Sequence, residues 1–180
     1  MIDSTLISVP ANASFNFRMA SQLDLEEVRQ LFLNAMMQMN SQGIDQWDAV
    51  YPNRDILTDD IQKQQMYLLT QDDTVVSVVV LNEEQDEQYR AAKWNYVDGK
   101  VAVIHRLCVK PSEQRKSLGK KTVLLAEQEL LRQEYDSVRL DAFSQNPFAL
   151  KLYRSLGYQK TGEAFFRKGT FYLYEKWLHT

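Results

Sequence analysis

Cysteine and histidine are scarce in this chain of 180 residues, which has one cysteine and two histidines. A single thiol, Cys108, excludes a disulfide within the chain and any metal cluster built on several cysteines. The two histidines, His105 and His179, lie far apart in the sequence, so we expect no zinc or other metal site. Because a reducing compartment disfavours disulfides, the scarcity of cysteine favours a cytoplasmic protein.

Long apolar runs and a strong net charge are also missing. No stretch approaches the roughly 20 consecutive apolar residues of a membrane-spanning helix. No basic residue precedes Arg18, although a secretory signal peptide would begin with one. The net charge is −3, so nothing draws the whole chain to nucleic acid or to an anionic membrane. We therefore expect no nucleic-acid partner and no membrane association.

The remaining composition is that of one ordinary globular domain, with 44% hydrophobic and 25% charged residues. A loose tail is expected over residues 1–14 and a single domain over 15–180. The periodicity of apolar residues predicts helices at 25–40, 56–65, 118–134 and 147–156, and strands at 15–20, 67–71, 75–82, 101–109, 138–142, 158–166 and 170–177. Residues 83–99 are polar and irregular, which indicates an insertion or a flexible loop. This order predicts a mixed α/β fold with one parallel crossover between 101–109 and 138–142.

Several element ends carry local signals. Ser21 to Asp24 has the form of a capping box before the first helix. Asp72-Asp73 is expected to form a tight hairpin turn. Asn146-Pro147 combines an N-cap with proline at the first helical position, and Gly157 stands where a helix commonly ends.

The stretch Gln114–Lys121 carries four basic residues and Gly119 between an apolar strand and a helix. Free N–H groups at a helix N-terminus, together with the helix dipole, favour an anion, and a glycine lets the backbone approach it closely. The stretch lacks the first glycine of a Walker loop and does not fit G-x-G-x-x-G. On its own it indicates either a phosphate site or a solvated basic loop.

The wider context of this stretch resembles the central motif of the GNAT superfamily of N-acetyltransferases. That motif is an apolar strand ending in V-x-P, followed by [QR]-x-x-G-x-[GA]. Gln114 and Gly119 match it, while Ser117 stands where the first glycine usually lies. Residues 146–158 resemble the second motif, N-x-x-A-x-x-x-Y-x-x-x-G-[FY], through Asn146 and Tyr153. The two motifs occur in the family's order, and the predicted elements cover about residues 15–178.

The resemblance implies a central, mostly antiparallel sheet of about six to seven strands, flanked by about four helices. One strand would splay from its neighbour at the site of the cosubstrate, acetyl-CoA. Main-chain groups of this strand would pair with the pantetheine arm, and the amides of residues 114–120 would bind the pyrophosphate. The residues assigned to the cofactor in this way are Leu107, Cys108, Val109, Gln114, Arg115, Lys116, Ser117, Leu118, Gly119, Lys120 and Asn146.

The implied activity is direct transfer of an acetyl group to a primary amine of a small molecule, peptide or protein, without an acyl-enzyme. The alternative is an acyl-CoA-binding sensor or scaffold that has lost turnover, which the side chain of Ser117 in the phosphate loop suggests. A homodimer is left open.

Tyr153 is the candidate acid, since a phenol with a pKa of about 10 is still protonated when a thiol with a pKa of about 8.5 leaves. Its alternative role is core packing. His105 is the candidate base. It alternates with apolar residues along its strand, so a hydrogen-bonded structural histidine, with water as the base, is the other interpretation. Trp47 and Tyr51 lie where the family's first helices cover the acceptor, and they are expected either to line that cleft or to pack in the core.

Overall fold

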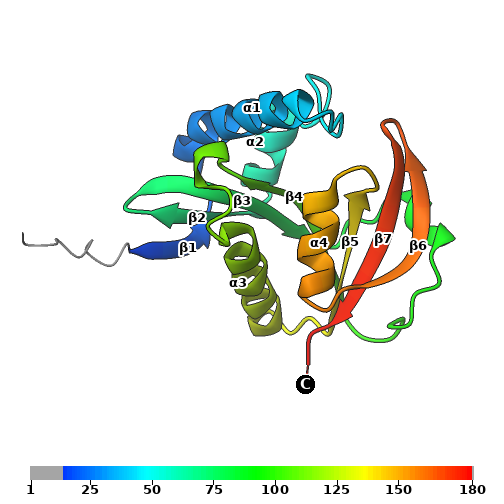
Figure 1. The fold of residues 1–180 in the computed structure, drawn as a ribbon. Coiled ribbons are helices and arrows are strands. Elements are labelled where there is room, and N and C mark those ends of the chain that lie inside the picture. The colour runs from blue at the N-terminus through cyan, green and yellow to red at the C-terminus, as the bar shows by residue number, and fades with distance from the viewer. Residues whose placement is uncertain (1–13, 180) are drawn as a thin grey trace, which may run out of the picture.

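One seven-stranded mixed sheet runs through the computed structural model, which describes residues 14–179 (Figure 1). The strand order is β1-β2-β3-β4-β5-β7-β6. All neighbours are antiparallel except β4 and β5, whose parallel pairing confirms the predicted crossover. The strands are β1 (Phe15–Met19), β2 (Met66–Gln71), β3 (Thr74–Asn82), β4 (Val101–Val109), β5 (Ser137–Phe143), β6 (Gln159–Phe166) and β7 (Gly169–Trp177). The expected tail lies outside the described residues except for Ser14.

Helices cover both faces of this sheet. They are α1 (Leu25–Ser41), α2 (Arg54–Gln62), α3 (Leu118–Arg132) and α4 (Pro147–Ser155), with short 3-10 turns at η1 (Gln22–Asp24), η2 (Glu87–Ala91) and η3 (Pro111–Glu113). The buried faces of α1 and α2 form one core with β2 and β3, and those of α3 and α4 form another core on the opposite face. None of the helices within residues 14–179 has both the length and the apolar character needed to cross a bilayer.

The local signals act as expected at most element ends. The Asn146 side chain caps α4 by accepting a hydrogen bond from the Ala149 N–H at 3.1 Å. Asp72 and Asp73 both have positive φ, of 47° and 64°, as a tight turn between antiparallel strands requires. The predicted bounds of α2 are wrong, because the helix begins at Arg54, two residues before the predicted start. The Asn53 side chain caps it there by accepting a hydrogen bond from the Ile56 N–H at 3.0 Å.

The parallel pair β4 and β5 is only partly joined. Their pairing runs from Val101–Ser137 to Ile104–Leu140 and ends there, so the residues of β4 from His105 onward have no neighbour on the β5 side. At the same point Arg106 has φ +53°, and the register between β3 and β4 shifts between Val78 and Val80. This bulge bends β4 away from β5 and opens the sheet on one side, as the predicted splay requires.

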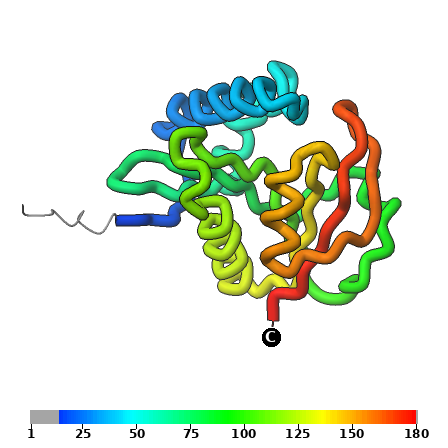
Figure 2. The backbone as a smooth tube through the Cα atoms, viewed as in Figure 1, coloured from blue at the N-terminus to red at the C-terminus, as the bar shows by residue number. Residues whose placement is uncertain are grey.

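The 83–99 segment is packed against the sheet, which supports an insertion over a flexible loop. Figure 2 shows this green segment running beside the orange strand β6, and η2 contacts that strand. Buried Glu175 of β7 accepts a hydrogen bond from the Asn95 N–H at 2.8 Å, and Arg139 of β5 donates to the Tyr96 carbonyl at 2.9 Å. Tyr89 is almost fully buried in the same contact.

Candidate functional site

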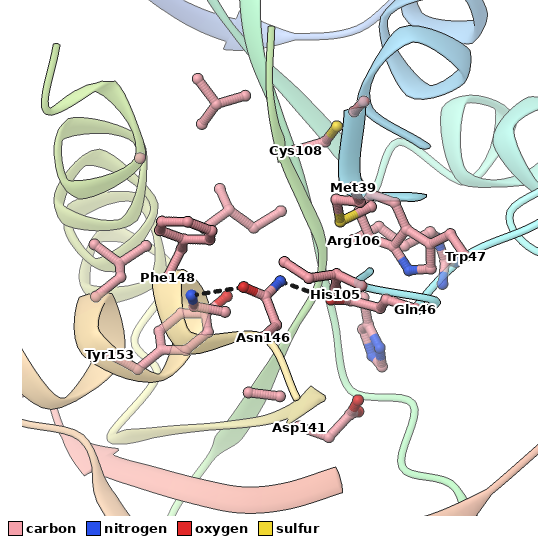
Figure 3. Close-up of a pocket in the computed structure, with 18 of the residues that line it drawn as sticks. Met39, Gln46, Trp47, His105, Arg106, Cys108, Asp141, Asn146, Phe148 and Tyr153 are labelled. Carbon is pink, nitrogen blue, oxygen red and sulfur yellow. Dashed lines mark hydrogen bonds between the residues drawn. The ribbon is translucent and has the colours of Figure 1, made fainter. Parts of the chain in front are cut away.

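A cavity of about 1230 Å³ occupies the region where β4 and β5 part. Its walls come from α1 and the α1–α2 connection, the end of β4, the loop before α3, the end of β5, the first turns of α4 and the tip of the β6–β7 hairpin (Figure 3). The expected site residues that line it are Trp47, Tyr51, His105, Leu107, Cys108, Val109, Gln114, Arg115, Ser117, Leu118, Gly119, Lys120, Asn146 and Tyr153. Lys116 is the exception and is not part of the lining.

The loop before α3 owes its shape to two left-handed residues. Arg115 has φ +65° and Ser117 has φ +59°, and α3 begins at Leu118. A residue other than glycine is strained in the left-handed backbone conformation. This strain is a physical reason for the glycine that the motif usually carries at the position of Ser117. The Ser117 side chain makes no capping hydrogen bond to the helix. The free N–H groups of the first helical turn therefore stand at the cavity edge.

The basic residues of this loop separate into two groups. Arg115 and Lys120 line the cavity and form no ion pair with residues 14–179. The Lys116 ammonium instead pairs with the Glu113 carboxylate at 2.8 Å, and Lys116 does not line the cavity. The Lys116 side chain is thus held in a local ion pair, while the role expected of its main-chain amide stays a prediction. Lys121, the fourth basic residue of the stretch, lies over the Phe15 ring, 4.6 Å from its centroid, and does not line the cavity. Arg115, Lys120 and the helix N-terminus are therefore the groups of this stretch that face an anion in the cavity.

Asn146 joins the two sides of the cavity. Its amide oxygen caps α4, and its amide nitrogen donates to Gln46 Oε1 at 2.8 Å, as Figure 3 shows. Gln46 belongs to the α1–α2 connection, so one buried side chain links two segments a hundred residues apart. Its position is set by hydrogen bonds on both ends, and it is therefore well ordered for contact with a ligand.

Tyr153 belongs both to the core and to the cavity. Its ring packs edge-on against Tyr158 with centroids 5.5 Å apart, and only 6% of the residue is exposed. Its hydroxyl forms no hydrogen bond with residues 14–179, yet it is not among the sealed polar atoms, because the cavity reaches it. Burial raises its pKa above the ordinary value, so the phenol keeps its proton at neutral pH. The two interpretations of Tyr153 are therefore compatible.

His105 is a hydrogen-bonded residue at the cavity wall. Its Nε2 lies 2.9 Å from Asn82 Oδ1 and 3.1 Å from the Glu84 carbonyl oxygen. Both partners are acceptors, so Nε2 carries the proton and the lone pair of the neutral ring is on Nδ1. Burial, aided by the positive charge of Arg106, lowers the pKa of His105 to about 4. The ring is neutral at pH 7 and only weakly basic.

Arg106 has the carboxylate partner that a structural arginine requires. Its guanidinium donates to both Asp60 oxygens, at 2.6 and 2.7 Å, and to the Tyr51 hydroxyl at 2.7 Å. Burial alone would lower the pKa of Arg106, but these hydrogen bonds outweigh it and raise that pKa. Tyr51 therefore lines the cavity and also fixes Arg106. Trp47 likewise combines both expected roles, since it lines the cavity and packs against Phe32 at 5.3 Å between ring centroids.

Asp141 is a cavity residue that the sequence motifs did not reveal. It lies on β5 and accepts a hydrogen bond from the Tyr89 hydroxyl at 2.8 Å. Burial raises the pKa of its carboxyl to about 6. The available signal was an acidic residue inside the short apolar strand at 138–142, where burial of a charge is costly unless it has a function or a partner.

Ion pairs connect the hairpin tip to the α1–α2 connection at the rim of the cavity. Arg167 donates to both oxygens of Asp48 at 2.8 Å, and Lys168 lies 2.6 Å from Asp45 and 2.9 Å from Asp48. Lys168 and Arg167 both line the cavity. Within the described part of the chain no group of three or more histidine, cysteine, aspartate or glutamate side chains is placed to hold a metal ion.

Comparisons with known proteins find similarity to acetyltransferases. A model of the acetyltransferase (GNAT) family matches residues 27–158. The S-(2-succino)cysteine N-acetyltransferase of Bacillus subtilis is 24% identical over 164 residues, which are 89% of this chain and 93% of that protein.

Solved structures share the fold. A GNAT-family acetyltransferase from Streptococcus agalactiae has a TM-score of 0.82 at 20% identity, covering 92% of this chain and 96% of the other. The PaiA N-acetyltransferase from Thermoplasma acidophilum, crystallised with coenzyme A, has a TM-score of 0.69 at 19% identity, covering 91% and 99% of the two chains.

Proposed function

The chain belongs to the GNAT family of acetyltransferases, and on this premise we propose that it transfers an acetyl group from acetyl-CoA directly to a primary amine. The observation that carries the proposal is the cavity where β4 and β5 part, which has at one end a helix N-terminus and two basic side chains, Arg115 and Lys120, that form no ion pair with residues 14–179. An anionic, elongated thioester fits this arrangement, because its phosphates and its acyl end need different surroundings.

The cofactor would lie along the open edge of β4. The main-chain groups of Leu107 and Val109 on the side that β5 has left would pair with the pantetheine arm. The Val109 carbonyl accepts a long hydrogen bond of 3.5 Å from Gln114 Nε2, which the cofactor would replace. The amides between Gln114 and Lys120 would bind the pyrophosphate at the start of α3, where the helix dipole favours negative charge. Asn146, fixed by its two hydrogen bonds, would contact the pantetheine.

The chemistry requires a neutral amine, a polarised thioester carbonyl and a proton for the leaving thiolate. We assign the last role to Tyr153, whose raised pKa keeps the donor protonated. His105 is neutral, and its Nδ1 lone pair can accept a hydrogen bond from the amine or from water. Its lowered pKa makes it a poor final acceptor of the ammonium proton, so we assign it to orienting the nucleophile.

Direct transfer is supported by the state of the one cysteine. Cys108 is 4% exposed, and burial raises the pKa of its thiol well above the ordinary value. A buried, protonated thiol is a weak nucleophile, so an acetyl-cysteine intermediate is disfavoured. Initial-rate plots with both substrates varied should intersect, whereas an acyl-enzyme would give the parallel lines of ping-pong kinetics.

Two measurements test the proposal together. Acetyl-CoA at 100 times its Kd should stabilise the fold by about 2.7 kcal/mol through mass action, seen as a rise in Tm. A panel of small amines, peptides and polyamines should then include an acceptor that releases free CoA, read with a thiol reagent. A thermal shift without CoA release across the panel would favour the sensor. No shift at millimolar acetyl-CoA would refute both functions.

A further inference from the structure

Asp141 stands at the point where β5 leaves β4. It follows Leu140, the last residue of β5 that pairs with β4. Every other residue of β5 is buried, whereas Asp141 is partly exposed and lines the cavity. A carboxylate at this place is accessible to whatever enters the gap between the two strands.

Asp141 and Tyr153 reach that gap from opposite faces of the sheet. Leu140 and Ala142 pack in the same cluster as Tyr153, on the face covered by α3 and α4. Side chains alternate along a strand, so Asp141 between them points to the other face. There its neighbour across the β5–β7 ladder is Leu173, which packs with Tyr89. Two reactants entering from the two faces would meet where the strands part.

The Asp141 carboxylate is held by a tyrosine of the 83–99 insertion. The Tyr89 hydroxyl donates to Asp141 Oδ2 at 2.8 Å, and Tyr89 is only 2% exposed. The Trp94 indole N–H donates to the Tyr89 carbonyl at 3.0 Å, and the two rings pack 5.7 Å apart. Burial raises the pKa of Tyr89 well above its usual range, so it stays a donor. The second carboxylate oxygen has no side-chain partner among residues 14–179.

The charges around Asp141 leave it without a counter-cation. Arg106 is the basic group on the adjoining strand, but its guanidinium is occupied by Asp60 and Tyr51. The other titratable groups that face Asp141 are Tyr89 and Asp86 of the insertion and the two tyrosines of the cavity, Tyr51 and Tyr153. None of these is a cation, and burial raises the pKa of Asp141 to about 6, although the positive charge of Arg106 opposes this rise.

The charged side chains of the cavity are therefore distributed unevenly, with basic residues near α3 and acidic residues near the 83–99 insertion. Arg115 and Lys120, which form no ion pair with residues 14–179, line the part of the cavity beside α3, whereas Asp141 and the exposed Asp86 line the part beside the insertion. Three other cations of the lining are held by carboxylates, Arg106 by Asp60, Arg167 by Asp48, and Lys168 by Asp45 and Asp48. Lys151 of α4 also lines the cavity. An anionic ligand and a cationic ligand would each find the complementary end. The separation of basic from acidic side chains would thus direct an anionic and a cationic substrate to different parts of the cavity by charge alone.

Resting on the proposed function, we propose that Asp141, held in place by Tyr89, binds the ammonium group of a cationic acceptor and takes its proton. The amine RNH₃⁺ gives one proton to the carboxylate, and the neutral nitrogen attacks the thioester carbonyl. The new C–N bond forms and the C–S bond breaks. The second nitrogen proton reaches the thiolate through Tyr153 as CoASH forms, and the proton on Asp141 passes to solvent. Tyr89 is a positioning residue, which keeps the free oxygen of Asp141 directed at the gap.

The test uses the acceptor found in the amine panel and compares wild type with Asp141→Asn and Tyr89→Phe. In Asp141→Asn, kcat/KM for the amine should fall by about 100-fold or more, the range of a lost general base. The acetyl-CoA Kd should change less than threefold, since the proposed cofactor path along β4 and the start of α3 does not include Asp141. The wild-type profile of kcat/KM should fall below a pH of about 6, where Asp141 takes up a proton, and Asp141→Asn should lack this acidic limb.

Tyr89→Phe tests the positioning role of Tyr89 through the acidic limb of the pH profile. If Tyr89 had only a structural role, this limb would not shift. The Tyr89 hydrogen bond favours the charged carboxylate, so its loss should raise the pKa of Asp141 and shift the acidic limb to higher pH. The matched control is Tyr135→Phe, which removes a 2.8 Å bond from a tyrosine to the Glu83 carboxylate outside the cavity. That control should leave the limb in place.

The outcomes separate the two proposals. If wild type acetylates an amine and Asp141→Asn keeps its rate and its acidic limb, the role of Asp141 is refuted while the acetyltransferase stands. An acidic limb that stays fixed in Tyr89→Phe would refute the positioning role of Tyr89. If wild type binds acetyl-CoA but acetylates no amine, the proposed function falls, and the role of Asp141 falls with it.

Discussion

Replacing Ser117 by glycine tests how the phosphate loop is built. Ser117 has φ +59° and ψ 18°, its side chain makes no capping bond to α3, and it is exposed at the cavity edge. The left-handed backbone at Ser117 therefore destabilises the folded protein, and no capping hydrogen bond from the serine side chain offsets this strain. Glycine would adopt the same conformation without that strain.

The expected magnitude follows from two opposing effects. A left-handed residue with a Cβ costs about 1–2 kcal/mol. Glycine returns that energy but loses about 0.5–1 kcal/mol through the greater freedom of the unfolded chain. Ser117→Gly should therefore stabilise the fold by about 0.5–1 kcal/mol, which raises Tm by about 1–4 °C for a domain of this size.

Ser117→Ala is the matched control, because alanine keeps the Cβ and the strain and removes only the hydroxyl. Urea unfolding should place Ser117→Ala within about 0.5 kcal/mol of wild type. The acetyl-CoA Kd should be unchanged in the alanine variant and equal or tighter in the glycine variant. If Ser117→Gly were less stable than wild type, the inference that the backbone at Ser117 is strained would be wrong. A tenfold loss of affinity in both variants would show that the hydroxyl, rather than the backbone, binds the phosphate.

Three further predictions concern the residues around the gap. Tyr153→Phe should lower kcat far more than it weakens acetyl-CoA binding, and equal turnover in a CoA-release assay would remove its acid role. His105 has a folded pKa of about 4, below its unfolded value of 6.5, so the stability it contributes is complete above pH 6.5 and is lost as the pH falls toward 4. Between pH 7 and pH 5, the free energy of unfolding of His105→Gln should therefore fall by about 2 kcal/mol less than that of wild type, as measured by urea titration. An equal fall in the two proteins would contradict the burial of the neutral ring. Asp60→Ala should destabilise the fold by about 3–5 kcal/mol, because it leaves the buried charge of Arg106 unpaired. Glu87→Gln, which breaks an exposed pair with Arg90, should leave urea stability unchanged, and comparable losses in both variants would argue against the buried pair.

Much of the fold could be predicted from the sequence because its signals are local. The N-cap at Asn146, the turn at Asp72 and the apolar strand ending at Val109 each involve residues within a few positions of one another. The second motif implies one site for Asn146 and Tyr153, and both residues line the cavity.

The missed features depend on distance along the chain or on backbone conformation. The hydrogen bond from Tyr89 to Asp141 joins residues 52 positions apart, and no periodicity reports such a pair. Lys116 has the same charge as Lys120, and only the backbone between them decides which one faces the cavity. The strain at Ser117 became visible only with its φ angle. Residue types thus indicated the kind of site, and the fold determined which residues form it.

The place of β7 in the sheet has a consequence for the synthesis of the protein. β7 lies between β5 and β6, although it follows both in the chain. A nascent chain interrupted before Gly169 leaves β5 with an open edge and β6 without its partner. The ion pairs from Arg167 and Lys168 to the α1–α2 connection then have no anchored hairpin behind them. On the ribosome, the part of the cavity wall at the tip of the β6–β7 hairpin can form only after β7 has emerged. Until then the edge of β5 is unpaired, and an unpaired strand edge is prone to aggregation.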